Sequence, residues 1–336
     1  MKPERTSKVL ISTKTWSRDS YNLFDYESIV LSEQQHLAEQ DCSILRIGNE
    51  VDFLEHNQEI CYQQSESRII AKIELSPRGF SIKSGKEEDL WRVVNSASSG
   101  HELHKNEIIK LGRVKLQVTH LKTKGAEKIS IDSIICAEGG VCRICFNEDN
   151  TNENPLIAPC HCTGTMKFIH LACLQTWINS KISKTTSGES VSYNWKNMDC
   201  EICQQQFPLA INCIGPYAFL AKIEDSESPY IILESMERDK NRSRGLHLIQ
   251  FNSEETLKMG RGHDSDIKFN DISVSRFHAS LTYSSGKFVI KDNKSKFGTL
   301  VQIPDSIDIS ETLTIQAGRT LISMNVVDGI SNMVIE

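Results

Sequence analysis

The chain has 336 residues, of which 39% are hydrophobic and 24% charged, with a formal net charge of −6 at pH 7. This length predicts two or three domains with ordinary hydrophobic cores. The net negative charge argues against general nucleic-acid binding, no apolar run reaches the roughly 18 residues of a membrane span, and no secretory signal is present. We therefore expect an intracellular protein of the cytoplasm or nucleus that acts through local sites.

The N-terminal part of the chain is expected to contain a polar tail over residues 1–24, followed by a β-rich region over about residues 25–120. Within this region Val114, Leu116 and Val118 alternate with polar residues. Such a period of two is typical of a half-buried β-strand.

Cysteine is unevenly distributed, because seven of the eleven cysteines fall between residues 142 and 203. Closely spaced thiolates on tight turns can bind one ion, and zinc takes four such ligands tetrahedrally. A disulfide framework is disfavoured without a secretion signal. Seven cysteines and one histidine therefore predict two structural zinc ions, bound by Cys142, Cys145, Cys160, Cys162, His170, Cys173, Cys200 and Cys203.

His161 is the ambiguous histidine of this segment, because it lies directly between Cys160 and Cys162. If it were a ligand, adjacent residues would compete for one coordination position. His170 instead reproduces the two-residue gap before Cys173. We expect His170 to bind zinc and His161 not to bind it.

The motifs CRICFNED, PCHCTGTMKFIHLACLQTW and CEICQQQF resemble the RING-CH finger, the C4HC3 variant of many RING-type ubiquitin ligases, in a domain expected over residues 138–210. A PHD finger shares the C4HC3 order but usually has an aromatic residue where this chain has Met198, whereas Trp177 stands where RING fingers place a tryptophan. The resemblance implies a cross-brace. One zinc would bind Cys142, Cys145, His170 and Cys173, and the other Cys160, Cys162, Cys200 and Cys203.

The resemblance also implies a scaffold with no catalytic residue, because two closed zinc sites offer no metal-bound water. RING ligases bind a ubiquitin-charged conjugating enzyme (E2) on a shallow apolar groove, to which Ile144, Trp177 and Pro208 correspond. Gln204 replaces a basic residue that often contacts ubiquitin, and Glu201 replaces a common proline. A non-catalytic adaptor therefore remains the alternative. The polar loop over residues 174–199 is expected to be a solvated excursion.

The last third of the chain has short apolar runs separated by turn residues, which predict a β-sandwich. Its motifs MGRGHDSDI, SVSRFHASL and DNKSKFGTL resemble the forkhead-associated (FHA) domain, a phosphothreonine-binding sandwich, in a domain expected over residues 226–336. By this resemblance Arg261 and Ser275 contact phosphate, Arg276 lies near the peptide backbone, and Lys296 stands where a phosphate-contacting Ser or Thr is common. His278 would brace the loops. Phe297 replaces an asparagine that grips the peptide, and a purely structural sandwich remains the alternative.

The two β-rich regions look like an internal duplication. SRIIAKIELSPRGFSIK (67–83) aligns without a gap with SRFHASLTYSSGKFVIK (275–291), and LGRVKLQV parallels AGRTLISM, with Gly112 opposite Gly318. Asn49 then replaces Arg261 and Ile70 replaces His278, so the first copy would be degenerate, with a structural or docking role. Chance similarity between β-rich segments is the alternative.

Together these patterns predict a multidomain, mainly β protein, in which two FHA-like antiparallel β-sandwiches, the first degenerate, flank a small α+β RING-CH cross-brace zinc finger. The implied function is a RING-type E3 ubiquitin ligase that binds an E2 and recruits phosphothreonine-containing partners. We expect neither nucleic-acid binding nor a membrane span. The alternative is a non-catalytic, phospho-dependent adaptor.

Overall fold

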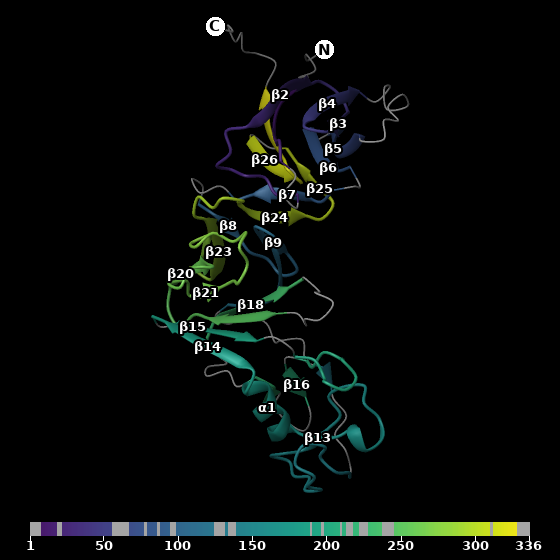
Figure 1. The fold of residues 1–336 in the computed structure, drawn as a ribbon, viewed down its shortest axis with the longest axis vertical. Coiled ribbons are helices and arrows are strands. Elements are labelled where there is room, and N and C mark those ends of the chain that lie inside the picture. Colours follow the sequence, from purple (N-terminus) through teal and green to yellow (C-terminus); the bar gives the residue numbers. More distant parts are fainter. Residues whose placement is uncertain are drawn as a thin grey trace, which may run out of the picture.

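The computed structural model describes residues 8–18, 22–55, 67–76, 79–85, 88–94, 99–123, 132–133, 139–188, 190–195, 198–208, 210–212, 218–221, 228–236, 245–309 and 312–327. The chain is mainly β and extended along one axis, with β2 and β4 near one end and α1 and β13 near the other (Figure 1).

The elements follow one another in three groups. The N-terminal group comprises β1 (Lys8–Trp16), β2 (Leu31–Ala38), β3 (Cys42–Ile47), β4 (Glu50–Glu55), β5 (Ser67–Ser76), β6 (Gly79–Ser84), β7 (Leu90–Val93), β8 (His101–Glu102), β9 (Ile108–Leu111) and β10 (Val114–Lys122). The middle group comprises β11 (Asp132–Ser133), β12 (Leu156–Ile157), the 3-10 helix η2 (Gly164–Met166), β13 (Ile169–His170), α1 (Leu171–Asn179), β14 (Ile182–Ser187), β15 (Ser190–Trp195), β16 (Ala210–Asn212) and β17 (Ala218–Phe219). The C-terminal group comprises β18 (Tyr230–Ser235), β19 (Leu246–Gln250), β20 (Glu255–Gly260), β21 (Ile267–Lys268), β22 (Ala279–Ser284), β23 (Lys287–Asp292), β24 (Thr299–Ile303), β25 (Ser306–Asp308), β26 (Thr312–Ala317) and β27 (Thr320–Val327).

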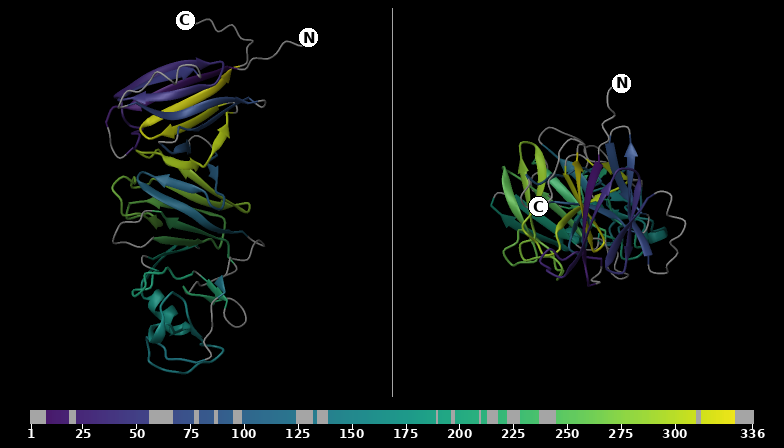
Figure 2. Two further views of the ribbon diagram at one scale, coloured as in Figure 1. Left: turned by 90° about the vertical axis from the view of Figure 1, so that its right-hand side faces the viewer. Right: turned by 90° about the horizontal axis from the view of Figure 1, so that it is seen from above.

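One long sheet runs through most of the molecule. Its twelve strands lie in the order β14-β15-β19-β18-β10-β9-β24-β7-β26-β27-β1-β2. Two five-stranded sheets, β21-β20-β22-β23-β8 and β25-β6-β5-β3-β4, lie over different parts of it. Figure 2 shows the resulting layers stacked along the long axis.

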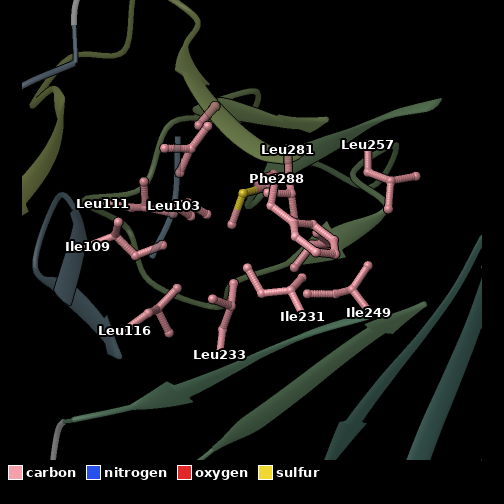
Figure 3. Packing of buried hydrophobic residues seen from close by; sticks show 14 of the residues in the cluster. Leu103, Ile109, Leu111, Leu116, Ile231, Leu233, Ile249, Leu257, Leu281 and Phe288 are labelled. Atoms are coloured by element: carbon pink, nitrogen blue, oxygen red, sulfur yellow. The ribbon is translucent and has the colours of Figure 1, made fainter. Parts of the chain in front are cut away.

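Two apolar cores fill the space between these layers. The N-terminal core joins the β25-β6-β5-β3-β4 sheet to β1, β26 and β27, with Ile73, Ile11 and Met324 all fully or almost fully buried. The central core joins the β21-β20-β22-β23-β8 sheet to β9, β10, β18 and β19, and Figure 3 shows Leu116 and Ile231 in this cluster.

Both cores combine strands from distant parts of the sequence. The hairpin β9–β10 pairs with β18, so that Leu121 lies opposite Ile231. The hairpin β26–β27 pairs instead with β1, where Met324 lies opposite Ile11. Strand pairing therefore crosses the expected boundaries at 25–120 and 226–336, and the two regions exchange their last hairpins.

The turns of the exchanged hairpins occupy the positions that the sequence alignment places opposite each other. Gly112 and Gly318 both have left-handed backbones, with φ of +60° and +57°. Added Cβ atoms would lie 2.5 Å from Ser273 Oγ at Gly112 and in contact with Glu88 at Gly318. Glycine is required for these close approaches as well as for the turns.

The expected polar tail differs from the structure. Residues 8–16 form β1, a strand between β2 and β27, in which Val9 and Ile11 are completely buried. Burial alternates along the strand, but the buried face continues from Val9 and Ile11 to Thr13 and Thr15. The apolar residues alone therefore do not show the period-two pattern.

The prediction of a solvated loop over residues 174–199 is wrong. Helix α1 continues to Asn179, and β14 and β15 then form a hairpin whose second strand pairs with β19. Val191, Tyr193 and Trp195 on β15 are buried in a third core, the finger core, which continues onto the outer face of β18 and β19. The zinc-finger region is thus joined to the long sheet by both hydrogen bonds and packing.

Candidate zinc finger and phosphopeptide site

The first cysteine cluster gathers Cys142, Cys145, His170 and Cys173, whose ligand atoms all lie within 4.8 Å of one another. The His170 Nδ1 atom lies 3.2 Å from Cys145 Sγ and 4.0 Å from Cys173 Sγ. Its Nε2–H donates a hydrogen bond to the Asp149 carbonyl, which orients the ring and leaves Nδ1 free to bind a metal.

The second cluster contains thiolates only and gathers Cys160, Cys162, Cys200 and Cys203, whose sulfur atoms also lie within 4.8 Å of one another. Cys162 Sγ and Cys200 Sγ lie 3.7 Å apart. The two clusters are interleaved along the chain, which is the cross-brace that the resemblance implied. His161 is exposed and lies in neither cluster.

The backbone around Cys142 favours the thiolate form that a metal requires. Burial raises the pKa of the Cys142 thiol, but N–H donors at Cys145, His170 and Ile144 outweigh it and bring the pKa down to about 6. The turn ends at Phe146, which has φ of +59° and donates its N–H to the Cys142 carbonyl at 2.8 Å.

Gln204 ends the equivalent turn of the second cluster. It has φ of +58° and donates its N–H to the Cys200 carbonyl at 2.8 Å, as Phe146 does to Cys142. Glu201 pairs with Lys181 at 2.7 Å. The sequence departures at these two positions are therefore compatible with a closed metal-binding turn.

Arg143 links the two clusters and was not identified from the sequence. It lies between the first two ligands, yet its Nη2 is 3.3 Å from Cys200 Sγ and its Nη1 is 3.9 Å from Cys160 Sγ. Nη1 also donates to the Met166 carbonyl at 2.7 Å. The guanidinium offsets part of the negative charge that four thiolates leave around one Zn²⁺. The CRIC motif contained the residue, but no spacing rule relates it to a distant cluster.

Both clusters fit zinc, because each presents four sulfur or imidazole donors at the corners of a small closed site. The donors leave no position for water. The two sites are therefore structural, and two ions complete the finger.

The three residues expected to bind an E2 differ in exposure. Ile144 is 41% exposed. Trp177 is half-buried, with its ring nearly perpendicular to that of Phe207 and the Lys181 ammonium 3.8 Å from its ring centre. Pro208 lines a cavity of about 520 Å³ between the finger and β10. Ile144 is thus the most accessible of the three positions.

The FHA-like motifs come together on three loops at one end of the central core. Arg261 donates its N–H to the Ser275 carbonyl at 3.1 Å, and Lys296 donates its N–H to Ser275 Oγ at 3.1 Å. The side chains of Arg261, Arg276 and Lys296 are exposed. An added Cβ at Gly260 would lie 2.2 Å from the Arg276 carbonyl, so two of the loops are in direct contact.

His278 braces these loops from below and is completely buried. Its Nδ1 accepts a hydrogen bond from the Ser275 N–H, and its Nε2–H donates to the Gly298 carbonyl, both at 3.0 Å. Burial lowers the pKa of His278, which keeps the ring neutral and preserves this donor–acceptor arrangement.

Phe297, which stands where the resemblance places an asparagine, lies beside the N-terminal region. Its ring centroid lies 6.4 Å from that of Trp16, and the Tyr26 N–H donates to the adjacent Lys296 carbonyl at 2.9 Å. The Lys296 ammonium lies 3.4 Å from an Asp25 carboxylate oxygen. The loop that carries Lys296 and Phe297 therefore contacts Trp16, Asp25 and Tyr26 of the N-terminal region.

The N-terminal residues that the sequence alignment matches to Arg261 and His278 have other partners. Asn49 Oδ1 accepts a hydrogen bond from Arg319 Nη1 at 2.6 Å. Ile70 is completely buried in the N-terminal core, so apolar packing replaces the hydrogen bonds of His278. At these N-terminal positions, neither the exposed arginine nor the bracing histidine of the C-terminal loops is present.

A family model described as RING-variant domain matches residues 142–203, and one described as FHA domain matches residues 257–320. The chain therefore combines a RING-variant zinc finger with an FHA domain. Among known proteins it is similar to E3 ubiquitin-protein ligase MARCHF8 of Homo sapiens, with 30% identity over 142 residues that cover 42% of each chain. It is also similar to E3 ubiquitin-protein ligase MARCHF7 of Rattus norvegicus, with 36% identity over 141 residues that cover 42% of this chain and 17% of the relative.

The chain thus spans less than half the length of these relatives. No solved structure matches it. Within the part of the chain that the structure describes, no helix combines the length and apolarity needed to cross a membrane.

Proposed function

We propose that this chain is a RING-CH-type E3 ubiquitin-protein ligase whose finger binds a ubiquitin-charged E2. The two closed metal clusters and the exposed Ile144 support this proposal, as does the similarity to proteins named E3 ubiquitin-protein ligases. The finger would act as a scaffold, since its thiolates are occupied by metal and none is free to act as a nucleophile.

We further propose that the layers around the N-terminal and central cores are two FHA-like sandwiches with exchanged terminal hairpins. The matched turns at Gly112 and Gly318 and the ungapped alignment of residues 67–83 with 275–291 support this assignment. In this arrangement each sandwich is completed by the other copy, and neither folds from its own residues alone.

The second half of the proposed function is recruitment of phosphothreonine-containing partners. Arg261, Ser275, Arg276 and Lys296 surround one end of the central core, and three of them are exposed cations. A phosphothreonine carries a charge of about −1.5 to −2 and strong acceptor oxygens, which suit guanidinium and hydroxyl donors on braced loops. The loop with Lys296 and Phe297 would leave the phosphate contacts of Arg261 and Ser275 in place. The peptide backbone would then be recognised on the side of the site where Asp25 lies.

An autoubiquitination assay with a panel of E2 enzymes tests the ligase proposal. Ile144→Ala should lower activity at least about tenfold, which corresponds to about 1.4 kcal/mol of E2 docking energy. Leu75→Ala is the matched control, because Leu75 is 53% exposed but lies on β5, far along the chain from the finger. If no E2 supports activity with zinc-loaded protein, the ligase proposal is wrong. The alternative that Gln204 leaves open, a non-catalytic adaptor, then replaces it.

A further inference from the structure

A cluster of two histidines and one glutamate lies outside both cysteine clusters, where the chain passes from β7 into the central core. His101 is the first residue of β8, His104 and Glu107 lie in the turn before β9, and their ligand atoms all lie within 4.8 Å of one another. The sequence His-x2-His-x2-Glu carries no function in the proposals above.

The backbone holds this segment in place at both ends. His101 on β8 is paired with Ile290 on β23. At the other end, the Val118 N–H donates to the Glu107 carbonyl at 2.8 Å, and the Asn106 N–H donates to the Val118 carbonyl at 2.7 Å. The three side chains therefore project from a fixed frame and not from a free loop.

The separations between the side chains are those of a zinc ligand set. His101 Nε2 lies 3.1 Å from each Glu107 carboxylate oxygen, and His104 Nδ1 lies 3.5 Å from Glu107 Oε1. Nitrogen and oxygen ligands about 2.0–2.1 Å from zinc, placed tetrahedrally, are about 3.3–3.4 Å apart. In the finger, the sulfur and nitrogen of Cys145 and His170 are 3.2 Å apart, so the new cluster is comparably organised.

Glu107 has a local role that metal binding would leave intact. Its Oε2 accepts the His104 N–H at 2.8 Å and so closes the turn. Oε1, which faces both rings, remains available as a ligand. The His101 and Glu107 side chains are only 15% and 24% exposed, whereas His104 is 65% exposed, so an ion could enter from the His104 side.

We propose that His101, His104 and Glu107 bind one Zn²⁺ ion, with water in the fourth position. Two imidazoles and a carboxylate suit zinc better than the harder Mg²⁺ or Ca²⁺, which prefer sets composed of oxygen. The ion would join β8 to the start of β9 and so clamp the segment that crosses between the two β-rich regions. Because one ligand is largely exposed, this zinc should be weaker and more readily removed than the finger zincs.

The test is zinc titration of the full chain that already carries its two finger ions, as verified by metal analysis. We expect one further Zn²⁺ equivalent, and a melting temperature that rises with added zinc. His101→Ala and Glu107→Gln should both lose this equivalent while keeping the finger ions; Glu107→Gln can still accept the His104 N–H, so it should remain folded. His263→Ala, at an exposed histidine beside Lys268, is the matched control and should leave binding unchanged.

Cobalt substitution supplies a second readout. Co²⁺ in the finger gives thiolate charge-transfer absorption, whereas a third Co²⁺ bound by nitrogen and oxygen should add only weak visible bands. The proposal is overturned if wild-type protein takes up no third ion. It is equally overturned if His101→Ala and Glu107→Gln bind as wild type does, or if His263→Ala loses the third equivalent to the same extent.

Discussion

Replacing Leu116 with alanine tests the exchange of hairpins between the two cores. Leu116 is completely buried in the central core, on a strand held between β9 and β18. The substitution removes three carbon groups, which is about 2.4 kcal/mol at 0.8 kcal/mol each, and the cavity left between paired strands adds about 1–2 kcal/mol. We therefore expect a destabilisation of about 3.5–4.5 kcal/mol.

The informative measurement is which strands lose protection against amide hydrogen exchange. Leu116 lies in the first β-rich region by sequence, yet amide hydrogen exchange should accelerate in β22 and β23 of the C-terminal group, because these strands enclose the same core. Met324→Ala is the matched variant, since Met324 is completely buried in the N-terminal core. It should accelerate exchange in β3 and β5 instead. If Leu116→Ala labilised β3 and β5 while β22 and β23 stayed protected, each region would close its own core and the exchange would be refuted.

Four further outcomes are expected. His170→Ala should lose one zinc by metal analysis while His161→Ala keeps both, because only His170 lies in a cluster. Arg143→Gln should speed transfer of the second-cluster zinc to a chelator several-fold, with Arg143→Lys intermediate; equal rates would show that the guanidinium contributes nothing. In peptide titrations, Arg261→Ala should weaken phosphothreonine binding by about 1.5–3 kcal/mol, and unchanged affinity would place the phosphate elsewhere. Burial lowers the pKa of Lys110 to about 8. At Lys110 the unfolded chain then binds more protons above pH 8, so this residue's contribution to stability in urea should rise between pH 8 and 10, by at most about 3 kcal/mol. The stability difference between wild type and Lys110→Met across this pH range measures that contribution.

Local chemistry made the finger predictable from the sequence. A Cys-x2-Cys turn positions its sulfurs through two adjacent residues, so spacing alone was enough to indicate Cys142 with Cys145 and Cys200 with Cys203. The FHA-like loops were found for a similar reason, since Arg261 and Ser275 belong to short motifs.

Long-range pairing was not predictable in the same way. The hairpins around Gly112 and Gly318 have similar sequence patterns, so the pattern alone does not indicate which core each hairpin joins. The reach of Arg143 to Cys200 depends on the cross-brace and not on any spacing. In β15 the buried Tyr193 and Trp195 alternate with polar residues, and the surrounding serines made the strand read as a loop.

The exchanged hairpins also determine how the two proposed activities are arranged in space. In the long sheet, β24 follows the Lys296 loop and β15 comes from the finger, and β9, β10, β18 and β19 lie between them. Five strand-to-strand steps of about 4.8 Å place β15 and β24 about 24 Å apart. The four intervening strands act as a spacer, and two of them, β9 and β10, come from the first β-rich region. A fragment restricted to residues 226–336 would therefore lack half of this spacer and the core residue Leu116.

A phosphothreonine bound near Arg261 would lie well away from the finger, and the ubiquitin acceptor on a recruited partner should be remote from its phosphorylated residue. Phosphopeptide binding and ligase activity should accordingly be measured on the full chain, where the spacer is complete.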